Sequence, residues 1–398
     1  MHVPLLDLKA QYATLRPVME ARLREVIESQ QFILGPAVEN FEHAVRDYCR
    51  SAFALGMSSG TDAQLAILMH LGIGPGDAVI TTPFTFFATA GCVARVGART
   101  IFCDIEPETF NLSPAAVAAY LAEVAKRDAA GVLRAPTGER IRAIVPVHLF
   151  GLCAAMDEFL ALGRTYGLPV LEDASQAIGA EYSHADGRTG IAGSMGEFGW
   201  YSFFPSKNLG ALGDAGLAVG RDPNAEAPLR AMRMHGMDRQ YFHRFVGGNF
   251  RLDALQAAAL SVKLPFLDGW SDARRANAAR YREIFKSAGT GERVKLPSEP
   301  YADRGLRHHH IYHQYVIRVR RRDALQAHLK ERGIGCAIYY PLPLHLQECF
   351  ASLGYRRGDF PEAERASNEV LALPVYPELT PDQMSYVAET TVEFVRLG

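Results

Sequence analysis

The sequence has little net charge, few cysteines and no long apolar run. Its 42 lysines and arginines nearly balance its 44 aspartates and glutamates, which gives a formal net charge of −2. Such a balance provides no basic surface for nucleic acid or for an anionic membrane. We therefore expect neither as a partner, and we consider small molecules or a second copy of the chain instead.

Membrane insertion and secretion are also disfavoured by what is missing. The longest uncharged segment, residues 78–94, is short for a spanning helix and contains four threonines, Pro83 and Gly91. Asp7 and Lys9 interrupt the N-terminal residues early, so these residues do not have the pattern of a signal peptide. The expected location is the cytoplasm.

Metal and disulfide chemistry have equally little support. The six cysteines form no CxxC motif and are expected to be small core residues in a reducing compartment. The histidines have no convincing metal spacing within a helix, so we predict no metal site.

The N-terminal two-thirds alternates apolar strand-like segments with amphipathic helical ones. Strands are expected in residues 53–60, 78–82, 99–105, 142–149 and 169–175, with helices and short loops between them. This order predicts a mostly parallel sheet covered by helices, an α/β fold. Residues 126–142 are polar and glycine-containing and are expected to form an exposed excursion.

The pattern changes beyond Leu260. Residues 262–289 read as one long amphipathic helix that can bridge two domains. It is followed by strand segments at 313–319 and 336–340, a helix at 321–333 and a C-terminal helix. We therefore predict a large domain, residues 1–265, and a small α/β domain, residues 266–398.

Two segments place polar residues where a strand ends, the usual location of ligands in open α/β sheets. Residues 58–63 (SSGTDA) open a helix whose backbone N–H groups could bind a phosphate, although the same residues are common helix caps. Residues 171–180 (LEDASQAIGA) carry Asp173 and Gln176. Asp173 could hold a cationic ring nitrogen, or it could cap a turn.

A third segment, SFFPSKNLGALGDAG at 202–216, places Lys207 between aromatic residues and glycines. Such a lysine is either a surface residue with a buried stem or a chemical group. Desolvation would lower its pKa and favour the free amine, which can form a Schiff base. A phosphate cradle, a carboxylate for a ring nitrogen and an imine-forming lysine together match the needs of pyridoxal phosphate.

The chain resembles the DegT/DnrJ/EryC1/StrS family of sugar aminotransferases over nearly its whole length. That resemblance implies the fold-type I architecture of pyridoxal phosphate-dependent transferases, with a large domain built on a mostly parallel, seven-stranded-type sheet and a smaller C-terminal α/β domain. The matching stretches are PLLDLKAQY, FILGPAVENFE, SSGTDA, GIGPGDAVITTPFTFFATA, FCDIEPETFNL, IVPVHLFG, GLPVLEDASQAIGA, SFFPSKNLGALGDAG, GGNFRLDALQAA and YYPLPLHLQ.

The resemblance implies catalytic roles for two residues. Lys207 would form the Schiff base and carry protons, and Asp173 would pair with the pyridine nitrogen. Gln176 would reach the ring hydroxyl. Some relatives carry histidine at the lysine position and catalyse dehydration, so Lys207 favours transamination.

The resemblance also implies how the rest of the cofactor is held. Gly60, Thr61, Asp62 and Ser202 would bind the phosphate. Phe86 would stack on the ring, although periodicity alone would make it a core aromatic residue.

Asn249 would reach the phosphate of the neighbouring subunit's cofactor, which implies a homodimer with shared active sites. Arg251 could meet the substrate of that neighbouring site or form a structural ion pair. His308 and His309 lie in a stretch that resembles the family's substrate entrance, but a solvated loop leading into a strand is the preferred interpretation. His148 and His345 receive the same structural interpretation.

The implied reaction moves an amino group from L-glutamate to a keto group, at C3 or C4, of a nucleotide-linked sugar. A UDP-linked 3-keto-hexuronic acid is favoured modestly over dTDP-linked and 4-keto sugars. Two alternatives stay open: a pyridoxal phosphate-dependent lyase or isomerase, and a non-catalytic regulatory member that binds the cofactor or the nucleotide sugar. The 126–142 segment departs from shorter relatives and is expected to lie away from the cofactor.

Overall fold

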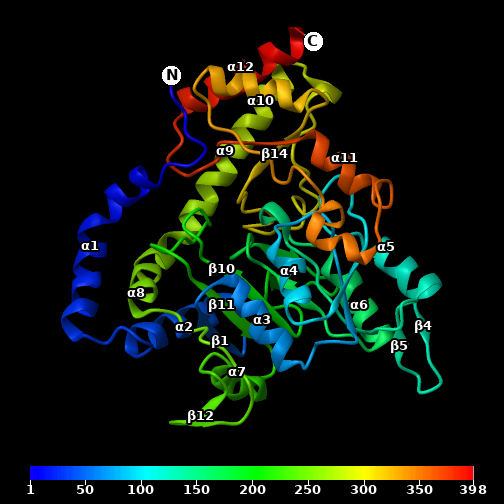
Figure 1. The fold of residues 1–398 in the computed structure, drawn as a ribbon. Helices are drawn as coiled ribbons and strands as arrows, with labels where there is room; N and C mark the ends of the chain where they lie inside the picture. The colour runs from blue at the N-terminus through cyan, green and yellow to red at the C-terminus, as the bar shows by residue number, and fades with distance from the viewer. Residues whose placement is uncertain (398) are drawn as a thin grey trace.

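The structure, a computed structural model, describes residues 1–397. A central sheet forms the middle of the molecule in Figure 1, and parallel bridges from Ile144 to Val170 and from Val147 to Asp173 join its two halves. Among the seven strands of the described residues that are given below, β11 runs antiparallel to its neighbours and the other pairs are parallel, so the expected mostly parallel, seven-stranded sheet is confirmed. The spatial order is β1 (Phe53–Met57), β11 (Gly216–Gly220), β10 (Phe198–Ser202), β7 (Leu171–Asp173), β6 (Arg140–Ile144), β2 (Asp77–Thr81) and β3 (Arg99–Phe102).

Both faces of this sheet are buried under helices. Successive strand side chains point to opposite faces, so Leu217 joins one apolar cluster and Ala218 joins the other. The first cluster lies under α2 (Pro36–Cys49), α6 (Met156–Tyr166) and α8 (Ala254–Lys263), and α1 (Leu8–Ser29) packs outside α8. The second lies under α3 (Gly60–His70), α4 (Ala88–Arg95) and α7 (Glu226–Met232).

The expected long helix after residue 260 is interrupted. Pro265 cannot donate the backbone hydrogen bond that a continuous helix requires, and a short 3₁₀ turn, η4 (Leu264–Phe266), separates α8 from α9 (Leu267–Ser287). In Figure 1, α9 runs from the sheet to the C-terminal lobe. The domain boundary expected at 265/266 falls within η4 and stays a prediction. Val3, near the start of the chain, packs into the apolar cluster of the C-terminal lobe.

The C-terminal lobe confirms most of the elements expected for it. One expectation was wrong: residues 336–340 form no strand, and only Ala337 makes a bridge, to Ala372. The second strand of the pair lies later in the chain. The lobe contains β14 (Tyr315–Arg318) paired with β15 (Val370–Leu373), together with α10 (Arg322–Glu331), α11 (Pro361–Glu369) and α12 (Pro381–Leu397).

The 126–142 segment is an excursion, but it is not irregular. Its strands β4 (Lys126–Arg127) and β5 (Leu133–Arg134) form a hairpin that extends the sheet from β6. It follows α5 (Pro114–Ala119) and the π-helical turn η1 (Tyr120–Val124), and it projects at the lower right of Figure 1. Two further hairpins are β8 (Glu181–Ser183) with β9 (Thr189–Ile191) and β12 (Met237–Arg239) with β13 (Phe242–His243).

The described residues include no helix with the length and apolarity needed to cross a bilayer. They also include no group of three or more His, Cys, Asp or Glu side chains arranged to hold a metal ion. Four cysteines are buried as expected, Cys336 is partly buried, and Cys349 is exposed, contrary to expectation.

Candidate active site

The N-terminus of α3 packs tightly against the end of β10. Ser59 caps the helix by accepting a hydrogen bond from the Asp62 N–H at 3.0 Å, so the expected cap exists, two residues before Thr61. A Cβ on Gly60 would lie 2.9 Å from the Cβ of Ser202, which shows how tightly the helix start packs against the end of β10. Backbone N–H groups at such a helix start favour an anion.

Asp173 lies at the end of β7 and its side chain is buried, 5% exposed. One carboxylate oxygen accepts a hydrogen bond from the Ser175 N–H at 3.1 Å, which is the expected turn cap. The other accepts from the hydroxyl of Thr89 at 2.8 Å. Each carboxylate oxygen therefore accepts one hydrogen bond and can accept another. Asp173 can thus cap the turn and also bind a cationic group.

Lys207 follows β10 in a loop that is fixed on both sides of it. The Lys207 N–H donates to the carbonyl of Phe204 at 2.8 Å, and buried Lys263 donates from its ammonium to the carbonyl of Gly210 at 2.6 Å. Desolvation lowers the pKa of Lys207 to about 8, although the negative charge of Asp173 acts in the opposite direction. The lysine is therefore closer to a free amine than a surface lysine is.

Asn208 ties this loop to the segment that precedes β14. Its amide nitrogen donates to the carbonyl of Ile311 at 3.1 Å, so its oxygen accepts from Nδ1 of His313 at 3.1 Å. Burial, followed by the charge of Lys207, holds the pKa of His313 well below its usual range.

Gln176 connects the two lobes at the site. Its carbonyl oxygen accepts from the Phe150 N–H at 2.9 Å, and its amide nitrogen donates to the Tyr340 hydroxyl at 2.9 Å. Phe86 is 57% exposed, with its ring centroid 6.5 Å from that of Tyr340, so Phe86 is not the core residue that periodicity favours.

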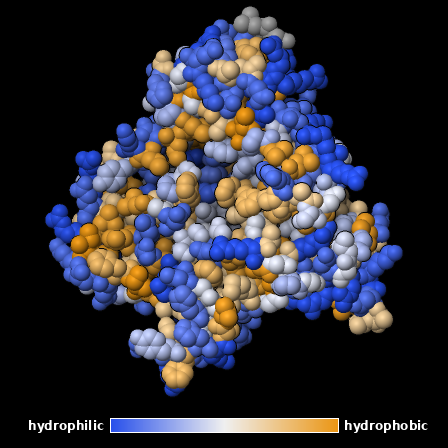
Figure 2. Space-filling view, viewed as in Figure 1, coloured by the Kyte–Doolittle hydropathy of each residue, from blue (hydrophilic) through white to orange (hydrophobic). Residues whose placement is uncertain are grey.

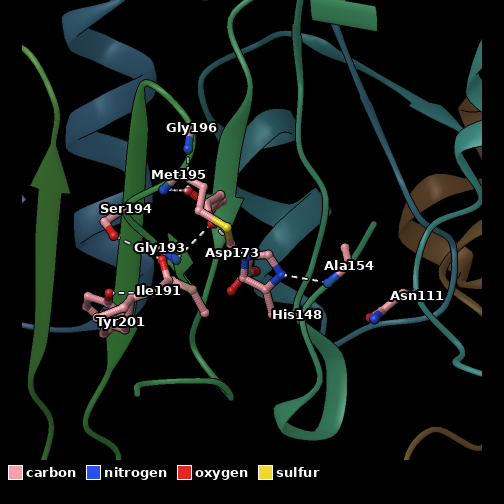
Figure 3. Close-up of polar contacts among 12 residues, drawn as sticks. Asn111, His148, Ala154, Asp173, Ile191, Gly193, Ser194, Met195, Gly196 and Tyr201 are labelled. Atoms are coloured by element: carbon pink, nitrogen blue, oxygen red, sulfur yellow. Dashed lines mark hydrogen bonds and ion pairs between the residues drawn. The ribbon is translucent and has the colours of Figure 1, made fainter. Parts of the chain in front are cut away.

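A buried network next to Asp173 was missed in the sequence because His148 was treated as an unremarkable residue. His148 Nδ1 accepts from the Ala154 N–H, so Nε2 donates to Glu172 at 2.8 Å. Glu172 also accepts backbone N–H groups from Gly193, Met195 and Gly196. Figure 3 shows His148 beside Asp173 and close to this loop. The network therefore joins β7 to the loop that leads into β10 and to the segment that follows β6.

The segment with Asn249 and Arg251 lies along the end of β1, where Phe250 accepts a hydrogen bond from the Ser58 N–H. Asn249 is exposed. Arg251 points Nη1 at Met234 Sδ, 4.0 Å away, and its buried Nε has no hydrogen-bond partner among the described residues. Within the described residues, Arg251 makes no ion pair, which was one of the two roles considered for it.

The histidine run is not a solvated loop, so that preferred interpretation was wrong. His308, His309 and His310 are each 5% exposed or less. His308 Nε2 lies 3.0 Å from Asp272, and His309 Nε2 lies 3.2 Å from Glu299. The Nε2 atom of each of these two histidines therefore already has a carboxylate partner. The assignment of His308 and His309 to the substrate stays a prediction. His345 is likewise buried and lies 3.1 Å from Glu364.

Comparison with known proteins identifies the family. A profile of the DegT/DnrJ/EryC1/StrS aminotransferase family matches residues 15–392. The chain belongs to this family. The aminotransferase is 46% identical over 396 residues to a pleiotropic regulatory protein of Geobacillus stearothermophilus, with coverage of 100% of this chain and 99% of that protein.

One further relative is named for a reaction on a sugar, and one solved structure has a closely similar fold. A UDP-N-acetyl-3-dehydro-alpha-D-glucosamine 3-aminotransferase of Acidithiobacillus ferrooxidans is 38% identical, over 97% of this chain and 96% of that protein. The solved structure of Streptomyces venezuelae DesV in complex with a ketimine intermediate superposes with a TM-score of 0.88 at 35% identity, covering 99% of this chain and 98% of that one.

The aminotransferase is pyridoxal phosphate-dependent, and its residues fit that cofactor. The tight contact of Gly60 with Ser202 places the α3 N-terminus beside the strand that leads to Lys207. The same strand pairs Trp200 with Asp173, which places the carboxylate on the neighbouring strand end. A helix N-terminus suited to an anion, a buried carboxylate and an amine of lowered pKa therefore lie together at the carboxyl ends of β7 and β10.

Proposed function

We propose that this aminotransferase transfers an amino group from L-glutamate to the C3 ketone of a nucleotide-linked sugar. The observation that supports the amino-transfer chemistry is the state of Lys207. Its amine has a pKa of about 8, and the charge of buried Asp173 acts on it. An amine that is partly unprotonated near neutral pH can attack a carbonyl and can later accept and return a proton.

Bound pyridoxal phosphate supplies the electron sink for this chemistry. Asp173 holds a proton on the ring nitrogen, and Lys207 carries protons at Nζ. Thr61, Ser202 and the backbone of residues 60–62, which include Gly60 and Asp62, would hold the phosphate, and Phe86 would cover the ring. The Gln176 amide group donates one hydrogen to Tyr340, and its second hydrogen would be available to the ring hydroxyl.

The choice of C3 is supported by the names of several relatives. One is a UDP-2-acetamido-2-deoxy-3-oxo-D-glucuronate aminotransferase of Pseudomonas aeruginosa, 36% identical over 95% of this chain. Another is a dTDP-3-amino-3,4,6-trideoxy-alpha-D-glucose transaminase of Streptomyces venezuelae, 36% identical over 98% of this chain. All of these names place the nitrogen or the ketone at C3. We favour a UDP-linked 3-keto-hexuronic acid, with dTDP-linked 3-keto sugars second and 4-keto sugars third.

We also propose that the active enzyme is a homodimer in which Asn249 reaches the neighbouring cofactor site. Large apolar side chains are exposed around the site, including Phe204 and Leu212 in the lysine loop at 52% and 48%. Tyr241 and Val246 are exposed by 82% and 85% in the segment before Asn249. Figure 2 shows apolar side chains gathered over α1 and α8 as well. Large exposed apolar side chains gathered in this way are typical of an interface.

The first experiment tests the chemistry. Purified protein is mixed with pyridoxal phosphate and then with L-glutamate, with Lys207→Ala and the exposed-lysine control Lys295→Ala in parallel. We expect a borohydride-reducible visible band in the wild type and in the control, bleached by L-glutamate with release of one equivalent of 2-oxoglutarate. Absence of the band in the wild type would favour the non-catalytic regulatory alternative. A band that L-glutamate leaves unchanged would favour a lyase or isomerase.

The second experiment tests the substrate. The amine-loaded protein is offered UDP- and dTDP-linked 3-keto and 4-keto sugars, and NMR locates the nitrogen in any product. Amination only at C4 would overturn the C3 assignment and leave the aminotransferase chemistry intact.

The third experiment tests the shared site. Differently tagged Lys207→Ala and Asn249→Ala chains are co-expressed, and the mixed dimer is isolated. If each site takes lysine from one subunit and asparagine from the other, one site of the mixed dimer keeps both, and it should show about half the activity of a wild-type dimer. A monomer in solution, or a mixed dimer as inactive as the Lys207→Ala parent, would contradict the proposal.

A further inference from the structure

Thr89 makes a buried contact with Asp173 that the known chemistry does not assign. Thr89 lies in the first turn of α4 and is 1% exposed. Its hydroxyl donates to the Asp173 carboxylate at 2.8 Å, and that donation uses its only hydrogen. The hydroxyl of Thr85, 3.3 Å away, must therefore donate to Thr89. In this series of hydrogen bonds, each threonine hydroxyl therefore donates toward the Asp173 carboxylate.

The backbone of Thr89 joins two other parts of the site. Its carbonyl accepts a hydrogen bond at 2.8 Å from the amide of Gln64, which is buried on α3 one turn after Gly60. Its N–H donates to the carbonyl of Phe86 at 3.3 Å. One residue therefore contacts the carboxylate, the helix at the proposed phosphate site and the segment that presents the proposed stacking ring.

We propose that Thr89 is a positioning residue that orients the Asp173 carboxylate toward the cofactor ring nitrogen. This inference rests on the proposed role of Asp173. The Ser175 N–H holds one carboxylate oxygen and Thr89 holds the other, so the plane of the carboxylate is set from two sides. Without the hydroxyl, the carboxylate can rotate about its last side-chain bond, and a hydrogen bond with a charged partner is lost.

The test measures binding of pyridoxamine 5′-phosphate to the cofactor-free protein. This probe cannot form an imine with Lys207, so its affinity reports the non-covalent contacts alone. Thr89→Val, which keeps the shape but lacks the hydroxyl, should bind the probe about tenfold more weakly, because hydrogen bonds to charged groups contribute that much or more. Thr89→Ser, which retains a hydroxyl, should restore binding to within about threefold of wild type.

Thr81→Val is the matched control. Thr81 is also buried, and its hydroxyl makes one hydrogen bond, to the Val145 carbonyl at 2.8 Å. Thermal unfolding of each cofactor-free protein shows whether it has folded. We expect the control to bind the probe as wild type does, even if it unfolds at a lower temperature. Equal loss of affinity in folded Thr81→Val and Thr89→Val would assign Thr89 a merely structural role and overturn the proposal.

A double-mutant comparison separates this inference from the proposed function. If Thr89 acts through Asp173, adding Thr89→Val to Asp173→Asn should weaken binding less than twofold further. If Asp173→Asn alone leaves binding intact, the proposed role of Asp173 fails. If Asp173→Asn weakens binding but Thr89→Val alone does not, or if the two losses simply multiply, only the inference about Thr89 fails.

Discussion

The amide of Gln176 donates a hydrogen bond to the hydroxyl of Tyr340 at 2.9 Å, although 164 residues separate them. Gln176 follows the carboxyl end of β7, and Tyr340 belongs to the C-terminal lobe. Tyr340 also packs against Phe84, with ring centroids 6.1 Å apart. The bond therefore links the C-terminal lobe to the segment that follows β7.

Removing the Tyr340 hydroxyl should loosen this connection. Tyr340→Phe keeps the ring but leaves the Gln176 N–H without its acceptor, so we expect the free energy of unfolding to fall by about 1 kcal/mol. In denaturant unfolding, the control is Tyr339→Phe, because the Tyr339 hydroxyl makes no hydrogen bond to any of the described residues. A control that loses as much stability as Tyr340→Phe would show that the bond contributes nothing of its own.

The lowered pKa of Lys207 predicts how the reaction with pyridoxal phosphate depends on pH. Below pH 8 the amine is mostly protonated and unreactive, and above it the amine is mostly free, so the rate should rise with pH and level off above about 8. Stopped-flow absorbance from pH 6 to 10 measures the midpoint. Asp173 raises the pKa, so Asp173→Asn should move the midpoint lower. A midpoint near 10, the value of an exposed lysine, would contradict the structure.

Glu172 should be more important for stability than its distance from the chemistry suggests. It is fully buried, and its two oxygens accept from three backbone N–H groups and from His148. Glu172→Gln replaces one acceptor by a donor, so we expect a loss of about 3 kcal/mol in the free energy of unfolding. Asp186→Asn, which breaks an exposed ion pair with Arg188, should leave that free energy unchanged. Similar effects in the two variants would refute this distinction.

Gly60 should tolerate no side chain. A Cβ there would lie 2.9 Å from Ser202 Cβ and 3.2 Å from Ser202 Cα, so Gly60→Ala should separate the α3 N-terminus from β10. We expect a cost of about 1–3 kcal/mol in stability and about tenfold weaker binding of pyridoxal phosphate. Equilibrium dialysis measures the affinity.

Gly269→Ala is the comparison for that prediction. A Cβ at Gly269 on α9 meets nothing within 4 Å, so this variant should gain about 0.5–1 kcal/mol from helix propensity and should bind the cofactor normally. Normal affinity in Gly60→Ala would show that the helix start can move without affecting the cofactor.

Local sequence patterns alone predicted much of this protein. Alternation of apolar and polar residues located most strands and helices, because side-chain periodicity follows directly from backbone geometry. The mostly parallel sheet and the family were confirmed. Asp173 ends β7, Gln176 follows that strand, and Lys207 follows the neighbouring strand β10. The roles of these three residues in cofactor binding and catalysis stay predictions.

Tertiary structure decided the contacts between distant segments. Thr89 and Asp173 are 84 residues apart, and only the strand order places α4 over the end of β7. Burial of His308 and His309 depends on carboxylates of α9 and of Glu299, which a local pattern cannot show. The strand expected at 336–340 failed for the same reason: β14 pairs with β15, residues 370–373, instead. Periodicity describes one element at a time, whereas the partners of a buried polar group are set by how the whole chain packs.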